Sequence, residues 1–394
     1  MPARILVISD LHAHVGEEND SAPSNLSFAR VGGQGDTLLE DCIDTVENRF
    51  GDVEAVLVPG DLTDRANPDA LSHVWQKLHE VATRLNAQLV ATAGNHDYDS
   101  RDNPEANPKG SLQTLRPRFP VDDRAAQASF FAYNYCQTET SNFQFLVLNS
   151  SAHHGYTVDG KPEFEHGRID SATLGELKSD LHPSDNLKKR LLVLHHHISQ
   201  LPGLDHAEMS MLREGGELTD FLSEETPWMV IHGHKHRPYI QWAPGNSLSP
   251  LLFSAGSFSA NMGGGPWGAQ VRNQFHVIEF DDDVDDSLGV DLAGTVYSWS
   301  YAGVGWQPAP VEHVLPHESG FGFRGSVAVM AKQIRSQLAI SHRLDTNDLQ
   351  SLVPALRYVN AFDLNALKRI LEAGTPRTSV SLSASGRIEE VELV

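Results

Sequence analysis

The sequence has little cysteine, no long apolar run and no excess of positive charge. Its 394 residues include two cysteines, too few for a disulfide framework, so we interpret Cys42 and Cys136 as small buried apolar residues. No run approaches the roughly 18 apolar residues of a membrane span, and no basic stretch before an apolar one opens the chain. We therefore expect a cytoplasmic protein without membrane contact.

The net charge limits the classes of partner that we expect for this protein. Lysine and arginine total 30 against 52 aspartate and glutamate residues, which gives a net charge of −22. Proteins that bind duplex DNA without sequence preference usually have a basic face. The composition therefore argues against a large nucleic-acid surface, although metal ions and a local basic patch would offset part of the charge. The length allows two or three domains.

Five short polar blocks each follow an apolar run of the kind that forms a buried strand. Turn-forming residues end each run. Open α/β sheets build their sites at the carboxyl ends of strands. The pattern therefore predicts Asp, Asn and His side chains gathered at such an edge. The blocks are Ser9-Asp10-Leu11-His12, Gly60-Asp61-Leu62-Thr63-Asp64-Arg65, Gly94-Asn95-His96-Asp97, Leu194-His195-His196-His197 and Ile231-His232-Gly233-His234-Lys235-His236.

The residue types in these blocks predict a site for two metal ions. Asp10 and His12 stand two residues apart, so in an extended segment both would point to the same side, and His234 and His236 repeat this spacing. Two ions about 3.5–4 Å apart need a ligand that reaches both, and the carboxylate of Asp61 offers two oxygens. Imidazole and carboxylate without thiolate suit manganese, iron or zinc. We expect two divalent ions, with manganese first.

Each block alone has an ordinary explanation as a turn or loop, but all five in this order favour a metal site. Together they resemble the calcineurin-like metallophosphoesterase superfamily over residues 4 to 300. The resemblance implies an α/β fold, the four-layer α/β/β/α sandwich of that superfamily. It also implies two sets of metal ligands, Asp10, His12, Asp61 and His236 for one ion and Asp61, Asn95, His195 and His234 for the other.

The same resemblance implies a mechanism. A hydroxide shared between the metals attacks phosphorus in line, and His96 protonates the leaving oxygen as general acid. Asp64 orients His96 and fixes its tautomer. Arg65 matches a phosphate-contacting arginine of the protein-phosphatase branch, and a salt bridge in its own loop is an equal alternative. His196 stays open as an alternative ligand to His195, because the proline that often closes this block is missing.

The substrate is expected to be a phosphodiester, a cyclic nucleotide or a related small molecule. One alternative is a DNA nuclease subunit of the repair type that works with an ATPase partner. Another is a phosphomonoesterase or protein phosphatase. We predict a catalytic domain over residues 1–310 and a small C-terminal α+β module over 311–394, used for packing or for contact with a partner such as the ATPase.

Local patterns predict most elements. We expect a long loop over 98–125 and a hairpin that pairs 129–135 with 142–149. Asp36 is the expected N-cap of the first helix. Helices are predicted near 36–49, 68–86, 171–181, 207–223, 326–340 and 345–372, and further strands near 4–8, 54–58, 88–93, 191–194, 229–232, 251–260, 274–280, 290–306 and 380–394.

Overall fold

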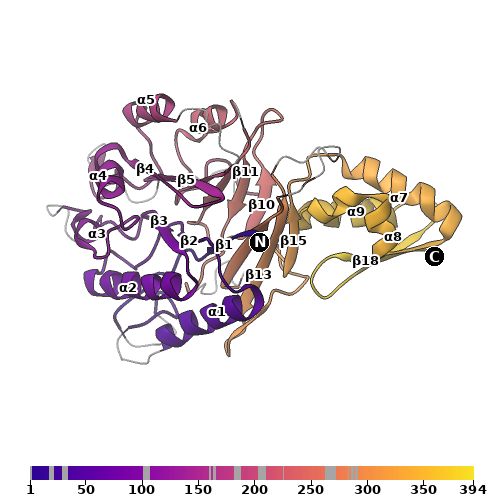
Figure 1. The fold of residues 1–394 in the computed structure, drawn as a ribbon, viewed down its shortest axis with the longest axis horizontal. Helices are drawn as coiled ribbons and strands as arrows, with labels where there is room; N and C mark the ends of the chain where they lie inside the picture. Colours follow the sequence, from indigo (N-terminus) through magenta and orange to yellow (C-terminus); the bar gives the residue numbers. More distant parts are fainter. Residues whose placement is uncertain are drawn as a thin grey trace. The chain divides into compact units, whose positions relative to one another are not determined.

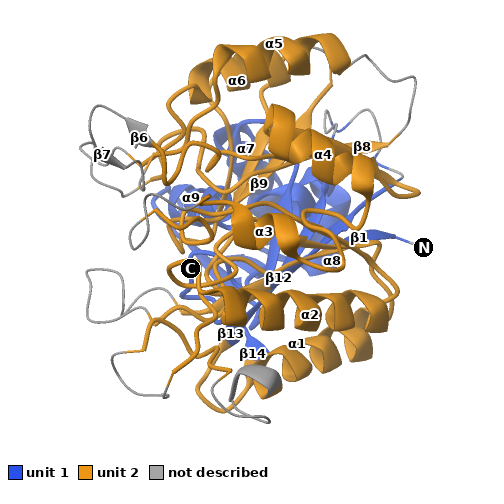
Figure 2. Cartoon of the chain, turned by 90° about the vertical axis from the view of Figure 1, so that its left-hand side faces the viewer, with its two compact units in different colours: residues 1–4, 276–300, 307–394 blue, residues 5–275, 301–306 orange. Residues whose placement is uncertain are grey.

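The structure is a computed structural model, and its described residues form two compact units (Figure 2). Unit 1 comprises residues 1–4, 276–300 and 307–394, and unit 2 comprises residues 5–275 and 301–306. The described residues are 2–16, 22–28, 34–100, 107–158, 161–162, 166–181, 188–202, 210–224, 226–261, 272–282, 284, 288 and 292–394.

One sheet contains the strands β1 (Ala3–Val7), β2 (Ala55–Val58) and β3 (Gln88–Ala91), which pair in parallel in that order. Their apolar residues are buried, as expected for parallel strands that helices cover. Helices α1 (Gln34–Phe50) and α2 (Pro68–Arg84) connect them. The side chain of Asn67 caps α2 by accepting from two backbone N–H groups, and Pro68 follows at the first helical position.

The second sheet of unit 2 has the order β10-β11-β9-β8-β5-β4, parallel from β11 to β5 and antiparallel at both edges. Leucines of α5 and α6 share an apolar core with it. Figure 1 shows α1 and α2, the two sheets, and then α5 and α6 in succession, which confirms the α/β/β/α fold. The elements are β4 (Tyr135–Glu139), β5 (Phe143–Leu148), β8 (Lys189–Val193), β9 (Trp228–His232), β10 (Tyr239–Trp242), β11 (Leu251–Ser254), α5 (Ser171–Asp180) and α6 (Gly215–Leu222).

Unit 1 combines longer strands with a helical region. β13 pairs antiparallel with β15, and a small antiparallel sheet has the order β16-β18-β17. Because residues 276–300 fall in the same unit as 307–394, the domain boundary at residue 310 stays a prediction. The elements are β12 (Gln274–Phe280), β13 (Gly294–Tyr301), β14 (Trp306–Pro308), β15 (Glu318–Phe321), α7 (Val327–Ser341), β16 (Arg343–Asp345), α8 (Thr346–Leu352), a 3-10 helix (Pro354–Tyr358), α9 (Ala361–Glu372), β17 (Thr378–Leu382) and β18 (Ile388–Leu393).

Three local predictions were wrong. The predicted strand at 129–135 is mostly the end of helix α4 (Arg124–Tyr133), which Asp123 caps, and the hairpin pairs β4 with β5. The alanines at the start of α4 favour a helix, and this outweighed the β preference of its aromatic residues. Helix α1 begins before Asp36, so that residue is not its N-cap. The predicted loop over 98–125 contains α3 (Gly110–Thr114).

Two helix predictions were right only in part. Residues 345–372 are divided among α8, a 3-10 helix that begins at Pro354, and α9. Residues 210–214, which precede α6, are not helical. α6 falls within the predicted helix at 207–223, of which residues 207–209 lie outside the described residues. The short strands β6 (Thr157–Val158) and β7 (Lys161–Pro162) pair with each other. Cys42 and Cys136 are buried free thiols, and burial raises the pKa of Cys136 to about 12.

Within the described part of the chain, no helix is both long and apolar enough to span a bilayer.

Candidate metal centre

The predicted ligands follow the carboxyl ends of five strands. β1, β2 and β3 end at Val7, Val58 and Ala91, and β8 and β9 end at Val193 and His232. The five polar blocks come directly after these ends or include them. The sheets therefore bring together side chains that lie far apart in the sequence, as the sequence pattern predicted.

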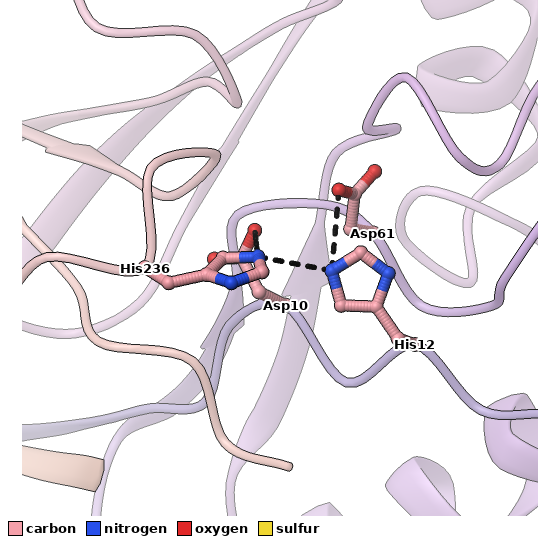
Figure 3. Close-up of side chains that lie close together, drawn as sticks. All are labelled: Asp10, His12, Asp61 and His236. Carbon is pink, nitrogen blue, oxygen red and sulfur yellow. Dashed lines mark hydrogen bonds and ion pairs between the residues drawn. The ribbon is translucent and has the colours of Figure 1, made fainter. Parts of the chain in front are cut away.

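One set of side chains, the first donor group (Asp10, His12, Asp61 and His236), directs its donor atoms toward one point (Figure 3). These atoms all lie within 4.8 Å of one another. His12 Nε2 is 3.0 Å from His236 Nε2 and 3.6 Å from Asp61 Oδ2. His236 Nε2 is 3.5 Å from Asp10 Oδ1. Ligands about 2.1 Å from one ion stand roughly 3–3.5 Å apart, so this spacing fits a single metal ion.

A second donor group (Asp61, Asn95, His195 and His234) lies beside the first. Asn95 Oδ1 is 3.1 Å from both His195 Nε2 and His234 Nδ1. His195 Nε2 is also 3.4 Å from Asp61 Oδ2, the same oxygen that faces His12. Asp61 thus belongs to both groups, as a carboxylate shared by two metal ions would.

The donor chemistry of both groups fits divalent cations. Asp10 and Asp61 are almost fully buried, and two buried carboxylates require compensating positive charge. Burial alone would raise the pKa of Asp61, but His195, His96 and His12 outweigh burial and hold that pKa well below its ordinary value. Asp61 is therefore ionised at neutral pH. Nitrogen and oxygen donors without thiolate suit manganese, iron or zinc.

His12 and His195 differ in charge. Burial lowers the pKa of His12 to about 4, so its ring is neutral at pH 7 and able to bind a metal. Burial would also lower the pKa of His195, but the charge of Asp61 and a hydrogen bond to it raise that pKa to about 9. In the metal-free chain His195 and Asp61 therefore form an ion pair. A binding cation must displace the His195 proton, so metal affinity should rise with pH.

The ligand residues adopt a backbone conformation that the sequence did not predict. The φ angles are 52° at Asp10, 47° at His12, 52° at Asp61, 76° at His234 and 53° at His236. The premise of an extended segment was therefore wrong for both His-containing pairs. Left-handed backbone costs about 1–2 kcal/mol per residue with a side chain, and such strain concentrates at functional sites.

Two glycines allow the ligand loops to approach each other. A Cβ atom on Gly94 would lie 2.1 Å from Asp61 Oδ1, and one on Gly233 would lie 2.4 Å from Asp10 Oδ2. Because the loops are so close, backbone N–H groups of one loop donate hydrogen bonds to the carboxylates of another. The amide of His96 donates to Asp61 Oδ1 at 2.8 Å, and the amide of His234 donates to Asp10 Oδ1 at 2.9 Å. Each of these ligand carboxylates is thus oriented by a backbone amide from another polar block.

His96 and Asp64 form a pair at the edge of the donor groups. His96 Nδ1 is 2.9 Å from Asp64 Oδ1, and the rings of His96 and His12 pack edge to face with centroids 4.7 Å apart. Burial would raise the pKa of Asp64, but the hydrogen bond and charge of His96 lower it overall. Arg65 Nε is 3.8 Å from Asp64 Oδ2, which is the salt-bridge alternative. Its contact with a phosphate stays a prediction.

The histidine triplet separates into different environments. His195 faces the second donor group, whereas His196 Nδ1 is 2.9 Å from Ser150 Oγ. Burial and the neighbouring charge of His195 hold the pKa of His196 well below its ordinary value. The identity of the ligand stays a prediction, and these contacts favour His195 over His196.

The structure adds residues that the sequence analysis did not single out. Ser210 Oγ lies 2.8 Å from His234 Nε2 and 2.9 Å from Lys235 Nζ. The hydroxyls of Ser24, Ser257 and Ser259 reach the loop that carries Asp10 and His12. The alternation of serine at 257 and 259 was the one local signal, and it did not indicate a partner.

Comparison with known proteins agrees with this geometry. Residues 3–238 match the family described as calcineurin-like phosphoesterase. A protein of Rhodococcus erythropolis (strain PR4 / NBRC 100887), named "Probable cyclic nucleotide phosphodiesterase", is 26% identical over 232 residues, which are 57% of this chain and 67% of that protein. The crystal structure of a dimetal phosphatase from Danio rerio aligns with a TM-score of 0.51 and 14% identity, covering 82% of this chain and 100% of that one. At this identity the likeness shows the fold alone.

Proposed function

We propose that this chain, which belongs to the calcineurin-like phosphoesterase family, is a binuclear metal-dependent phosphodiesterase that acts on a cyclic nucleotide or a related small phosphodiester. Family membership makes it a phosphoric ester hydrolase. The observation that carries the proposal is Asp61, whose one carboxylate oxygen faces His12 of the first donor group and His195 of the second. The name of the Rhodococcus relative supports a phosphodiester substrate.

The two donor groups would hold the two divalent ions. When bound, such ions stabilise negative charge on phosphoryl oxygens and lower the pKa of water. The chain's own contribution is the spacing and charge of its ligands. Asp10 and Asp61 are ionised and buried, and His12 is neutral, so these three are ready to bind a cation. We propose manganese as the ion, with iron or zinc as alternatives.

His96 is proposed as the general acid. Its Nδ1 faces Asp64 Oδ1, so in the protonated ring the Nδ1–H donates to this carboxylate and the proton on Nε2 is the one that passes to the leaving oxygen. The side chain of His96 is 26% exposed, which allows a substrate to reach it. Asp64 is a positioning residue in this scheme, because it acts through His96.

A panel of substrates tests the proposal. The metal-free chain is loaded with manganese, iron or zinc and assayed with 3′,5′-cyclic AMP, bis(p-nitrophenyl) phosphate, p-nitrophenyl phosphate and single-stranded DNA. We expect kcat/KM for the diesters to exceed that for the monoester. A preference for the monoester would replace the proposal with a phosphomonoesterase. Cleavage of DNA without turnover of small diesters would favour the nuclease that works with an ATPase partner.

A further inference from the structure

The loop that carries Asp10 and His12 is held on both of its sides. On one side its N–H groups donate to another ligand block: Asp10 to the Gly60 carbonyl at 3.2 Å and His12 to the Asp61 carbonyl at 3.0 Å. On the other side, no neighbouring strand in the described chain pairs with its carbonyls as a regular ladder. These carbonyls instead accept hydrogen bonds from side-chain hydroxyls.

Three buried serines, which we call the serine clamp (Ser24, Ser257 and Ser259), bond three consecutive carbonyls. Ser257 Oγ donates to the Asp10 carbonyl at 2.7 Å, Ser259 Oγ donates to the Leu11 carbonyl, and Ser24 Oγ donates to the His12 carbonyl at 2.8 Å. The clamp residues are at most 3% exposed. No water can replace these donors without opening the core.

Two of the three serine hydroxyls also accept a hydrogen bond from a backbone N–H group. Ser257 Oγ accepts from the Ala260 amide at 2.8 Å, and Ser24 Oγ accepts from the Leu26 amide at 3.1 Å. The Phe258 amide donates to the Ser9 carbonyl at 2.7 Å. The hydroxyl protons point at the ligand loop because the carbonyl oxygens of Asp10, Leu11 and His12 can only accept. The direction of each O–H group toward the ligand loop is therefore defined.

The clamp coincides with the strained part of the loop. Asp10 and His12 both have positive φ, which is uncommon for residues with a side chain, although Asp and His adopt it more often than most. A left-handed residue persists only where its surroundings determine it, and here the surroundings are the hydroxyls on one side and the Gly60–Asp61 carbonyls on the other. Loss of the hydroxyls would leave buried carbonyls without donors and let the loop relax toward ordinary φ values.

We propose that the serine clamp positions Asp10 and His12 for the first of the two metal ions. This rests on the proposed function only in taking the first donor group as a metal site. The clamp bonds the loop that carries Asp10 and His12, both of the first donor group, so we expect a larger effect at that metal site than at the other. Asp10 also accepts from the His234 amide, so a smaller effect at the second site is expected as well. Ser24, Ser257 and Ser259 touch neither substrate nor metal in this scheme and are positioning residues.

The test measures metal binding by the metal-free chain. Manganese is titrated calorimetrically into the wild type, the variant Ser257→Ala/Ser259→Ala and the control Ser254→Ala. Ser254 is a matched control because it is also a buried serine near the end of β11, but its hydroxyl has no hydrogen-bond partner among the described residues. Urea unfolding of each metal-free protein measures the fold separately.

We expect the double variant to bind one manganese ion about 10- to 100-fold more weakly, the size of effect found when groups that orient metal ligands are removed. The other ion should bind within about threefold of the wild type, and Ser254→Ala should match the wild type at both sites. Equal weakening at both sites, in step with lower stability, would mean that the serines only support the fold. Unchanged binding would overturn the clamp directly.

Two further outcomes separate this inference from the proposed function. Failure of the wild type to bind two manganese ions would contradict the binuclear site and leave no first site to position. If the double variant does not fold, the single variant Ser257→Ala decides. Among the three clamped carbonyls it removes only the donor of Asp10, and it also removes the acceptor of the Ala260 amide. Ser257→Ala must then also bind one manganese ion more weakly than the wild type while the other ion binds nearly normally. Without this difference between the two affinities, the proposal is wrong.

Discussion

The metal centre and the region from α7 to β18 (residues 327–394) bury opposite kinds of side chain. In the metal centre Asp10, Asp61 and His195 are at most 1% exposed. Within residues 327–394, all of which the structure describes, no charged side chain or histidine is buried, and the buried polar residues are Asn360 and Thr378. The core of that region is aliphatic. The metal centre thus buries ionisable side chains that can bind a cation, whereas residues 327–394 bury aliphatic side chains that stabilise the fold.

The two regions also differ in how far they follow local preference. Asp345 and Asp348 form a capping box on α8, and Asn360 caps α9 by accepting from the Asp363 amide, as these residue types prefer. Asp10 and His12 adopt backbone angles against preference. Substitutions should therefore separate the two: activity falls without loss of stability in one region, and stability falls without loss of activity in the other.

The largest effect is expected for Asp61→Ala. It removes the carboxylate that faces both donor groups, so both metal sites are damaged at once. We expect kcat/KM to fall more than about 10³-fold, beyond the loss of a single electrostatic contact, and metal content to fall below two per chain. Near-normal turnover with two bound ions, measured by elemental analysis, would contradict the shared-ligand assignment.

His96→Ala should separate chemistry from metal binding. The variant should retain both metals, because the first and second donor groups stay intact. Turnover of diesters with poor leaving groups should fall about 10²–10⁴-fold, the range for general acid catalysis, and turnover of bis(p-nitrophenyl) phosphate much less. Equal losses across leaving groups would argue against proton donation. Asp64→Asn should show the same trend more weakly, since Asp64 acts through His96.

Leu367→Ala should give the reverse result. Leu367 is fully buried in the aliphatic core of residues 327–394, so its truncation should lower the free energy of unfolding by about 2–5 kcal/mol. Manganese binding and kcat per folded molecule should stay within about twofold. Ile340→Ala is the control, because Ile340 is 74% exposed and should change stability by no more than about 0.5 kcal/mol. Loss of metal binding in Leu367→Ala would mean that the two regions are not separable.

The smallest effect concerns a buried histidine outside the donor groups. Burial lowers the pKa of His276 from 6.5 to about 3. Between these values the unfolded chain binds the proton and the folded chain does not, so this contribution to stability is present above pH 6.5 and is lost as pH falls through 6.5 toward 3. The loss by pH 5 is about 2 kcal/mol.

His276→Gln should remove that part of the pH dependence. Urea unfolding at pH 7.5 and pH 5 should show a smaller difference in the variant than in the wild type, whatever the variant's absolute stability. His342→Gln, at an exposed histidine, is the control and should keep the wild-type difference. An unchanged difference in His276→Gln would show that other groups cause the acid sensitivity.

The sequence predicted the position of the donor groups better than their geometry. Each polar block is short and follows a buried strand, so the parallel sheets determine where Asp61, Asn95 and His195 meet. The positive φ angles could not be predicted, because Asp10 and His12 have no local reason to adopt them. The serine clamp was missed for a related reason: serine is common, and a hydroxyl's partner is visible only after folding.

The helical errors have a local cause. Residues 129–133 are rich in aromatic side chains, which favour strands, but the Asp123 cap and the alanines after it set a helix that runs to Tyr133. The left-handed Asn134, with φ of 65°, then ends the helix and allows β4 to begin. Competing local preferences of this kind are resolved by capping and by tertiary packing.

Contacts around the metal centre join residues that are far apart in the sequence, and this affects when the site forms during folding. The bond from Ser257 to Asp10 spans 247 residues, and the contact between His12 and His236 spans 224. Contacts of such sequence separation form late, because the loop they close is long. During refolding from denaturant, manganese uptake should therefore lag behind the recovery of helical signal. In a chain made on the ribosome, we therefore expect the first donor group to be complete only after His236 has been synthesised.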